Sequence, residues 1–383
     1  MYKYSLKTLP LTFMDSIQNQ VLERVHCHIP AGTIVVGMSG GVDSSVSAAL
    51  LKAKGYDVIG LFMKNWEDDQ GCSAEEDAKD VARVASIIDI PFYTVNFAKD
   101  YWESVFEQFL LDLKNGFTPN PDILCNREIK FHKLLEKALS IGGNGLATGH
   151  YAMNHSSGKS YQLCRSYDQS KDQTYFLYTA TQQTLSKTLF PLSHLKKSEV
   201  RAIASALHLP VAEKKDSTGI CFIGERKFRD FIRPYLGTTP GPMISAEGKE
   251  MGTHEGLAYY TIGQRKGLKI GGQGEAWFVA GKEAAGNRLI IAQGANHPAL
   301  FADTLLAKEA HWISGVSPSF PLRCTAKIRY RQADQLCTVT DGPDGMIHVQ
   351  FDTPQRAITP QQSIVFYDGQ VCLGGGFILP NAR

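Results

Sequence analysis

The stretch that most constrains the fold of this chain is Gly37-Met38-Ser39-Gly40-Gly41-Val42-Asp43-Ser44. A β-branched apolar run at residues 33–36 precedes it and predicts a buried strand, and residues 45–51 after it have the composition of a helix. A strand that turns through two glycines into a helix leaves backbone N–H groups unpaired at the helix start. Phosphate oxygens can approach these donors closely because glycine lacks a Cβ. The sequence therefore predicts a phosphate-binding loop here.

Side chains within this loop add to the prediction. Asp43 suits a helix cap or a magnesium contact, and Ser39 and Ser44 can donate hydroxyl hydrogen bonds. The stretch resembles the PP-loop of the ATP pyrophosphatases, in which the loop holds the pyrophosphate that leaves when ATP adenylates a substrate. By contrast, Gly158-Lys159-Ser160 has Met153 where a Walker loop needs its first glycine. We therefore interpret residues 158–160 as a hairpin turn.

Composition limits the class of protein. The chain has 383 residues, of which 43% are hydrophobic and 20% are charged, as expected for a globular protein with more than one domain. Its net charge is only +2, so RNA binding would require local groups of basic residues. No apolar run approaches the roughly 20 residues of a membrane span, and residues 1–32 lack the apolar core of a secretory signal. We expect a cytoplasmic protein that does not contact membranes.

The eight cysteines include no Cys-x-x-Cys pair. Without a secretory signal, we expect no framework of structural disulfides. His26-Cys27-His28 is too closely spaced for a zinc site and lacks a matching second half, so we expect no metal site. Cys164, Cys324 and Cys337 lie in alternating β-like runs and are interpreted as buried core residues.

The first half of the chain alternates strand and helix patterns. Residues 57–63 and 91–97 have the composition of strands, and residues 75–88 and 101–113 have helical spacing. This repetition predicts an α/β fold with a doubly wound parallel sheet, in which ligands bind at the carboxyl ends of the strands. Met63, at the end of a predicted strand, is a candidate for the adenine pocket, and a core methionine is the alternative.

The composition of the sequence changes after about residue 230, where proline and glycine become frequent. Short apolar runs then indicate a small β-rich domain, and later β-like runs indicate a barrel. We divide the chain into an N-terminal extension (1–32), a PP-loop ATP pyrophosphatase domain (33–230), a central β-rich domain (231–300) and a C-terminal β-barrel (301–383).

Two cysteines, Cys125 and Cys221, lie in loops bracketed by proline or glycine. Cys125 lies where a helix is predicted to begin, so the helix dipole favours its thiolate. Asp122 would raise the pKa of that thiol if the two are adjacent, or it can serve as a general acid and base towards a substrate. From the residues alone, each cysteine can equally be a small buried side chain.

Further motifs are similar to those of the tRNA 2-thiouridylase family. They are Asn120-Pro121-Asp122-Ile123-Leu124-Cys125-Asn126, Gly149-His150-Tyr151, residues 171–177, residues 217–222, residues 260–267 and residues 372–376. Together with the phosphate loop they run from about residue 33 to the C-terminus. One departure is Thr359-Pro360-Gln361-Gln362, where the family usually has glycine before the final glutamine.

The resemblance implies ATP-dependent 2-thiolation of the wobble uridine of tRNA. ATP, with Mg²⁺ accompanying it and no dedicated protein site for the metal, would adenylate the C2 oxygen and release pyrophosphate. A persulfide on Cys221 would supply sulfur directly, or as hydrosulfide released by Cys125, and the two cysteines would end as a disulfide. The implied partners are the anticodon stem-loop of tRNA and a sulfur carrier or cysteine desulfurase, and we favour a monomer.

The resemblance also implies the site residues. The catalytic residues are Cys125 as nucleophile, Cys221 as persulfide carrier and Asp122 as acid and base. The ATP-binding residues are Gly37, Met38, Ser39, Gly40, Gly41, Val42, Asp43, Ser44, Met63 and Gly149. The tRNA-binding residues are Asn120, Pro121, Asp122, His150, Lys171, Asp172, Gln173, Arg329, Tyr330 and Gln362. On chemistry alone, the basic run at residues 327–331 is equally typical of a strand with one solvated face.

Two other functions are consistent with the residues. A PP-loop amidotransferase or synthetase that uses nitrogen would not need Cys125 or Cys221. A nucleotide-binding tRNA chaperone would bind ATP but release no pyrophosphate in the presence of tRNA. An iron–sulfur tRNA thiolase is disfavoured because no Cys-x-x-Cys pair is present.

Overall fold

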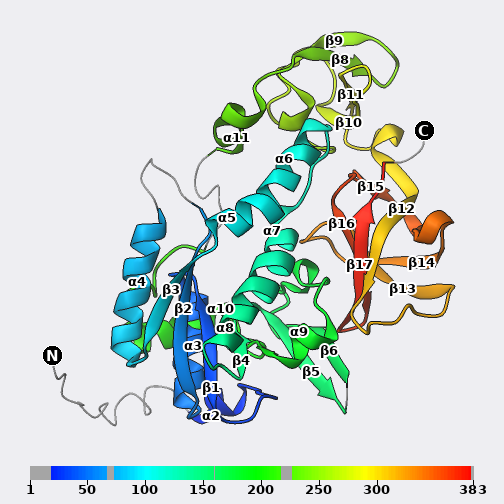
Figure 1. Cartoon of the computed structure of the whole chain (residues 1–383). Coiled ribbons are helices and arrows are strands. Elements are labelled where there is room, and N and C mark those ends of the chain that lie inside the picture. The colour runs from blue at the N-terminus through cyan, green and yellow to red at the C-terminus, as the bar shows by residue number, and fades with distance from the viewer. Residues whose placement is uncertain (1–18, 67–72, 159, 217–226, 381–383) are drawn as a thin grey trace. The chain divides into compact units, whose positions relative to one another are not determined.

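The computed structural model describes residues 19–66, 73–158, 160–216 and 227–380 (Figure 1). It forms two compact units, one holding the described residues of 1–101 and 126–218, the other those of 102–125 and 219–383. Within the described residues, no helix combines the length and the apolar character that crossing a membrane requires. The four-part division of the chain proposed above remains a prediction.

A parallel sheet organises the first unit (Figure 1). In spatial order its strands are β3 (Phe92–Asn96), β2 (Asp57–Lys64), β1 (Thr33–Met38), β4 (Gly145–Ala147) and β7 (Thr188–Leu189). The central strand β1 pairs in parallel with β2 on one side and β4 on the other. The outer pairs, β2 with β3 and β4 with β7, are also parallel. The predicted parallel sheet is therefore confirmed.

Helices cover both faces of this sheet. On one face are α3 (Val42–Ala53), α4 (Ser73–Ile88) and α10 (Lys197–Ala206), which share a core with the buried side chains of Ile34 and Val36. Because side chains alternate along a strand, Gly37 faces the other side. A Cβ at Gly37 would lie 3.1 Å from Leu134 of η2 (Cys125–Leu134), a π-helix that leads into α8 (Leu135–Ser140). The sheet is therefore doubly wound, as predicted.

The remaining elements of the first unit are short. They are α2 (Asn19–Glu23), α5 (Ala98–Tyr101), β5 (Ala152–Ser157), β6 (Ser160–Arg165), η3 (Thr174–Phe176) and α9 (Gln182–Ser186). Strands β5 and β6 pair antiparallel, with Ser157 opposite Ser160. The turn between them includes Gly158, whose φ of +64° favours glycine. The predicted hairpin is confirmed for the described residues on either side of Lys159, which itself lies outside them.

The helix predicted at residues 101–113 is present, and its first part is π-helical. A short π-helix, η1 (Trp102–Phe106), is followed by α6 (Glu107–Lys114) and, after a loop, by α7 (Pro121–Leu124). Helix α11 (Phe228–Leu236) packs on α6, with the rings of Phe109 and Phe228 6.3 Å apart.

Two β structures complete the second unit. The smaller sheet has the order β10 (Trp277–Glu283), β11 (Arg288–Gln293), β8 (Gly241–Ser245) and β9 (Glu250–His254), with η4 (Leu257–Tyr259) and η5 (Pro298–Leu300) nearby in sequence. The antiparallel barrel has the order β12 (Phe301–Trp312), β15 (Ile347–Arg356), β14 (Gln335–Asp341), β13 (Leu322–Lys327), β16 (Ser363–Asp368) and β17 (Val371–Ile378), with η6 (Pro343–Gly345) before β15. Pairing of β12 with β17 closes the barrel.

The barrel core is apolar and confirms the predicted architecture. Cys324 and Cys337 lie opposite each other on β13 and β14, buried inside the barrel. Cys164 on β6 is also buried. All three were expected to be core residues.

Candidate active site

The predicted phosphate-binding loop lies between the carboxyl end of β1 and the start of α3. Gly41 is the N-cap of α3 and provides no side-chain cap. Gly40 has a φ of +73°, and a Cβ there would lie 2.8 Å from the Cα of Asp77. A Cβ at Gly149 would lie 2.7 Å from the backbone nitrogen of Ser44. Both positions therefore require glycine, and neither places a side chain over the N–H groups that begin α3.

The two serines of the loop have different surroundings. The Ser44 side chain is buried, and its hydroxyl accepts a hydrogen bond from the Ser39 backbone N–H at 3.1 Å and donates to the Gly41 carbonyl at 3.3 Å. Ser39 is exposed, and its hydroxyl oxygen lies 3.2 Å from that of Ser44. Ser44 thus fixes the loop, and Ser39 presents a hydroxyl to solvent.

Asp43 does not cap α3, and that expectation is wrong. The capping position is the last non-helical residue, which is Gly41, and Asp43 lies inside the first turn. Both oxygens of its carboxylate accept from the Lys197 ammonium at 2.7 Å, and Oδ1 also accepts from the Tyr151 hydroxyl at 2.9 Å. Because its own chain occupies these oxygens, the structure does not favour a direct magnesium contact at Asp43.

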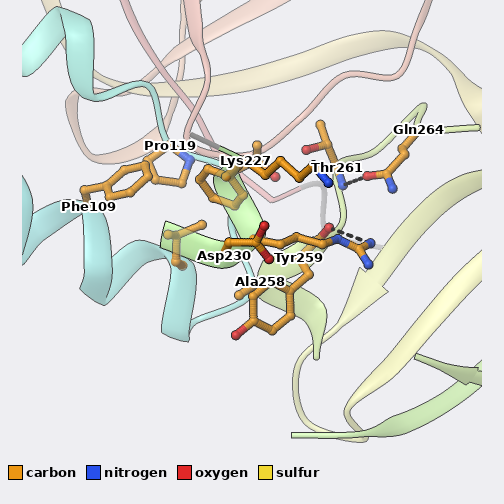
Figure 2. Close-up of a pocket in the computed structure, with 12 residues that line it drawn as sticks. Phe109, Pro119, Lys227, Asp230, Ala258, Tyr259, Thr261 and Gln264 are labelled. Carbon is orange, nitrogen blue, oxygen red and sulfur yellow. Dashed lines mark hydrogen bonds between the residues drawn. The ribbon is translucent and has the colours of Figure 1, made fainter. Parts of the chain in front are cut away.

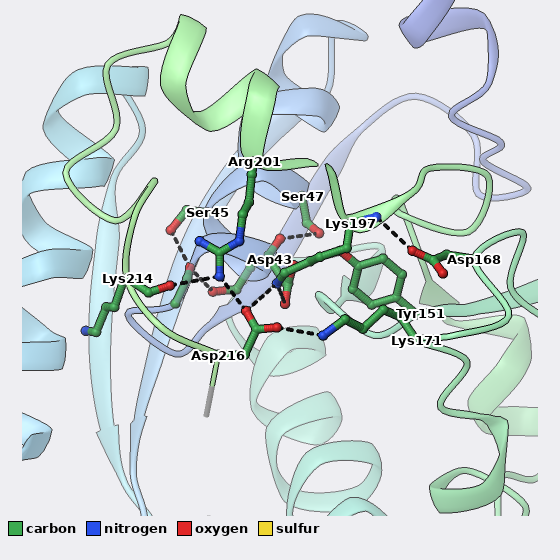
Figure 3. Close-up of polar contacts among 12 residues, drawn as sticks. Asp43, Ser45, Ser47, Tyr151, Asp168, Lys171, Lys197, Arg201, Lys214 and Asp216 are labelled. Atoms are coloured by element: carbon green, nitrogen blue, oxygen red, sulfur yellow. Dashed lines mark hydrogen bonds and ion pairs between the residues drawn. The ribbon is translucent and has the colours of Figure 1, made fainter. Parts of the chain in front are cut away.

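Lys197 joins Asp43 to a second carboxylate (Figure 3). Its ammonium lies 2.8 Å from Asp216, which also pairs with Lys171 at 2.7 Å and with Arg201 at 2.8 Å. Burial alone would raise the pKa of Asp216, but hydrogen bonds from Lys171 and Lys197 outweigh it and lower that pKa to about 2. The Lys197 side chain is largely buried, so it is the centre of this ion-pair network.

Lys214 fixes the loop from the other side. Its ammonium donates to the Gly40 carbonyl at 3.0 Å, to Asp77 at 2.6 Å and to Asp80 at 2.7 Å. Burial would lower the pKa of Lys214, but these two carboxylates raise it above its ordinary value. The cation therefore stays charged and holds the left-handed backbone of Gly40 against α4.

Sequence reasoning missed Lys197, Arg201, Lys214 and Asp216. Lys197 and Asp43 are 154 positions apart, and only the packing of α10 beside α3 brings them together. The one available signal was position: Asp216 directly precedes the motif at residues 217–222.

His150 lies among aromatic rings of the first unit. Its ring is 5.7 Å from that of Phe131 and 6.4 Å from that of Phe190, and its Nδ1 is 2.8 Å from the Thr148 hydroxyl. Burial, with a smaller contribution from the charge of Lys130, holds the pKa of His150 well below its usual value. The imidazole is therefore neutral at pH 7 and can offer RNA a hydrogen bond or a ring face, but not a charge.

The other predicted residues of this unit have partners within the chain. Asp172 is buried and accepts hydrogen bonds from the Ser166 backbone at 3.0 Å and from the Thr174 hydroxyl at 2.7 Å. Gln173 accepts from the Tyr151 backbone at 2.9 Å. Met63 is partly buried near the end of β2. Contacts of Asp172 and Gln173 with RNA, and of Met63 with adenine, stay predictions.

Asp122 and Cys125 lie one helical turn apart in the second unit, where such a spacing places side chains on the same face. The Asn120 side chain caps this segment by accepting from the Asp122 backbone at 3.1 Å, and Pro121 occupies the first helical position. The helical segment therefore begins one turn before Cys125, not at it as predicted, and Cys125 is only 1% exposed. Cys221 lies outside the described residues.

The predicted RNA-binding residues of the barrel unit are held by backbone and hydroxyl groups. Arg329 donates to the Thr359 hydroxyl at 2.5 Å, and Gln362 donates to the Thr118 carbonyl. Tyr330 is partly exposed, and the guanidinium of Arg331 lies 5.9 Å from its ring centroid.

A cavity of about 550 Å³ opens beside Thr118 and Pro119 in the same unit. Figure 2 shows Phe109 and Pro119 on one side and Thr261 and Gln264 on the other, with Lys227 between them. The Thr261 backbone donates to Gln264 at 3.0 Å, which fixes that amide. The lining combines aromatic rings with polar and charged side chains, among them Lys227, Arg229 and Asp230. Aromatic faces beside hydrogen-bonding groups, in a cavity of this size, suit a nucleobase.

Comparison with known proteins gives the family. Models described as "tRNA methyl transferase HUP domain", "tRNA methyl transferase PRC-barrel domain" and "Aminomethyltransferase beta-barrel domain" match residues 32–225, 229–293 and 302–378. The tRNA-specific 2-thiouridylase MnmA of Protochlamydia amoebophila is 57% identical over 350 residues, covering 90% of this chain and 93% of that protein. Its counterpart in Halalkalibacterium halodurans is 55% identical over 348 residues, covering 90% and 94%. The chain belongs to the tRNA-specific 2-thiouridylase family.

As a member of the 2-thiouridylase family, the chain is a tRNA sulfurtransferase enzyme. The U34-tRNA thiolase NcsA of Methanococcus maripaludis is a more distant structural neighbour, with 17% identity, a TM-score of 0.38 and coverage of 59% of this chain and 74% of that one. A similarity this low adds nothing to the assignment. The family supports nucleotide binding by this chain.

The depressed pKa of Asp216 makes stability depend on pH in this 2-thiouridylase. A carboxyl group with a pKa of about 2 when folded and an ordinary value when unfolded stabilises the fold above about pH 4, by about 1 kcal/mol once solvent screening of this partly exposed group is included. This contribution is lost as the pH falls towards 2, because the protonated group no longer pairs with Lys171 and Lys197. Asp216→Asn should therefore lower the free energy of unfolding at pH 7.

Urea unfolding of wild type and Asp216→Asn between pH 7 and pH 2.5 tests this. The difference in free energy of unfolding between wild type and Asp216→Asn should shrink below pH 4. Asp89→Asn, at an exposed position, should show no such change with pH. A difference that persists unchanged at the lowest pH contradicts the assignment of the ion-pair network.

Proposed function

We propose that this chain catalyses ATP-dependent 2-thiolation of the wobble uridine of tRNA. The observation that carries the proposal is the glycine-built anion loop at the start of α3, in a chain more than half identical to 2-thiouridylases along 90% of its length. The loop supplies a site for the leaving pyrophosphate, and the relatives supply the substrate class.

ATP would lie at the carboxyl edge of the parallel sheet. The backbone N–H groups of residues 39–44 and the exposed Ser39 hydroxyl would receive its phosphates, and Met63 and Gly149 would flank the adenine. The missing Cβ atoms at Gly40 and Gly149 support this fit. Mg²⁺ would accompany the phosphates as a counter-charge, since Lys197 and Tyr151 occupy the carboxylate of Asp43.

The C2 oxygen of uridine would attack the α-phosphorus, so that one O–P bond forms and pyrophosphate leaves. The outer sulfur of a Cys221 persulfide would then attack C2, and AMP would depart with the original oxygen. The Cys125 thiolate would attack the inner sulfur, which releases the thione and forms a Cys125–Cys221 disulfide. The two thiols supply the two electrons that reduce the sulfane sulfur, and an external dithiol reductant would reopen the disulfide.

The base would have to leave the anticodon stack to reach this chemistry. Asn120, Pro121 and Asp122 would contact it, with Asp122 moving a proton as acid and base, and the 550 Å³ cavity beside Thr118 would take a nucleotide of the same loop. The remaining proposed tRNA contacts are His150, Lys171, Asp172, Gln173, Arg329, Tyr330 and Gln362. Lys171 is already paired with Asp216, so binding RNA through it would require that ion pair to open.

The cellular setting is also part of the proposal. A reaction that needs ATP and reduced thiols fits the cytoplasm, where glutathione and thioredoxin keep cysteines reduced. Sulfur would arrive from a carrier protein or a cysteine desulfurase, and we favour a monomer.

Incubation with tRNA, ATP, Mg²⁺, a cysteine desulfurase, cysteine and a thiol reductant tests the function. Nucleoside mass spectrometry should show 2-thiouridine at the wobble position, with one pyrophosphate per thiolation. Pyrophosphate release without sulfur incorporation, even with the sulfur source present, would favour the nitrogen-using alternative. ATP binding without pyrophosphate release would favour the chaperone.

A further inference from the structure

A second, smaller cavity of the barrel unit contains an amine that the proposed mechanism does not use. The cavity has a volume of about 270 Å³ and is lined by residues 115–118, Thr359 and Pro360 from two loops, together with Ile262 and Lys282. None of its described lining residues is acidic. Residues 115–118 lead directly into Asn120, the proposed contact of the wobble base.

Lys282 projects from β10 towards this loop. Its ammonium lies 3.1 Å from the Thr118 hydroxyl and 3.5 Å from the Phe117 carbonyl. The neighbouring carboxylate on the strand, Glu283, is exposed and pairs with Arg288 at 3.6 Å. Among the described residues, no carboxylate pairs with Lys282, and withdrawal from solvent lowers its pKa to about 7.

A second cation lies behind the opposite wall. The guanidinium of Arg329 donates to the Thr359 hydroxyl at 2.5 Å and lies 3.5 Å from the Ile262 carbonyl, and both of these residues line the cavity. Lys282 therefore lines the cavity itself, and Arg329 lies behind the wall formed by Thr359 and Ile262. A space whose described lining residues include no carboxylate, and which has one basic side chain in its lining and another behind its wall, attracts anions.

The wall that carries Thr118 is held in place from the barrel. Gln362, a buried residue, donates to the Thr118 carbonyl, and Lys282 contacts the hydroxyl of the same residue. The cavity therefore keeps its shape, and an anion inside it would lie at a fixed position relative to Asn120.

We propose that this cavity is a phosphate site in which Lys282 pairs with a backbone phosphodiester of the tRNA anticodon loop. The RNA source rests on the proposed function, and inorganic phosphate is the other source of the same chemistry. An anion within about 4–6 Å raises the pKa of a lysine by about 1 to 3 units. Binding therefore recharges the amine, and the amine fixes the backbone next to the everted base.

Competitive acetylation with acetic anhydride over a pH series, followed by peptide mass spectrometry, measures the pKa of Lys282 in the full chain. Three samples are compared: protein alone, protein with inorganic phosphate, and protein with a synthetic anticodon stem-loop RNA. The RNA should raise the pKa of Lys282 by at least about one unit, and inorganic phosphate should not. If inorganic phosphate raises the pKa of Lys282 and the RNA does not, RNA is not the source of the anion. If neither raises that pKa, the cavity is not a phosphate site.

Salt dependence of RNA affinity provides an independent readout. Lys282→Met should lower the slope of log K against log salt by about 0.7, because one fewer counterion is released. Lys282→Arg should keep the slope, and so should Lys269→Met, which removes a side chain that is 79% exposed. An unchanged slope in Lys282→Met contradicts the proposal. Neither measurement uses ATP or sulfur, so absence of 2-thiouridine with an intact RNA-dependent shift would count against the proposed function alone.

Discussion

Replacement of Cys221 by serine is expected to lower 2-thiouridine formation at least about 10³-fold while uridine adenylation continues. A serine oxygen cannot carry a persulfide, whereas the phosphate loop that we propose for adenylation is unchanged. Pyrophosphate release and wobble-nucleoside mass spectrometry, with a cysteine desulfurase and cysteine as the sulfur source, measure the two steps separately.

Cys164→Ser is the matched control, because Cys164 is a buried residue of β6 with no proposed part in the chemistry. It should keep both activities apart from a modest loss of stability. If Cys221→Ser makes 2-thiouridine at the wild-type rate, the persulfide assignment is wrong.

Lys197→Met should have the second largest effect, lowering pyrophosphate release by about 10²- to 10³-fold. Lys197 lies 2.7 Å from Asp43 and 2.8 Å from Asp216, so its removal leaves two carboxylates facing each other beside the loop that must receive an anion. Breaking a largely buried ion pair also lowers the free energy of unfolding by about 3 kcal/mol or more. Single-turnover pyrophosphate release and urea unfolding measure the two effects.

The double variant Asp43→Asn/Lys197→Met separates stability from function. It removes the unpaired charge at Asp43 and should recover part of the lost stability, but not the rate. Lys52→Met, at a partly exposed position of α3 whose ammonium donates to the Asp89 carbonyl at 3.1 Å, should leave the rate and the stability unchanged. If Lys197→Met releases pyrophosphate at the wild-type rate, the ion-pair network has no part in the function of the phosphate loop.

The features predicted correctly are those that neighbouring residues determine. Alternating strand and helix periodicity predicted the doubly wound sheet, and two glycines between a strand and a helix predicted the tight turn before α3, because both patterns lie within short stretches. Anion binding by that turn stays a prediction. Lys197 and Asp216 were missed because they reach Asp43 only through tertiary packing. The expectation that Asp43 caps α3 was wrong because the capping residue is the last residue outside the helix. The exact start of a helix is difficult to predict from sequence.

The loop at residues 359–362 shows a local departure with a visible consequence. Gln361, which stands where the family usually has glycine, has a φ of +63°. A left-handed backbone costs a residue with a Cβ about 1 to 2 kcal/mol, so glycine is the natural occupant. Sequence identified the unusual residue, and only the structure shows that it bears backbone strain next to Gln362.

Transfer of the uridine C2 oxygen into AMP tests the central claim most directly. An anticodon stem-loop carrying ¹⁸O at C2 of the wobble uridine is incubated with the enzyme, ATP, Mg²⁺ and the persulfide source, and the AMP is analysed by mass spectrometry. Adenylation of that oxygen predicts one ¹⁸O atom in the AMP for each 2-thiouridine formed. AMP that carries only unlabelled oxygen, alongside thiolated RNA, would contradict the account.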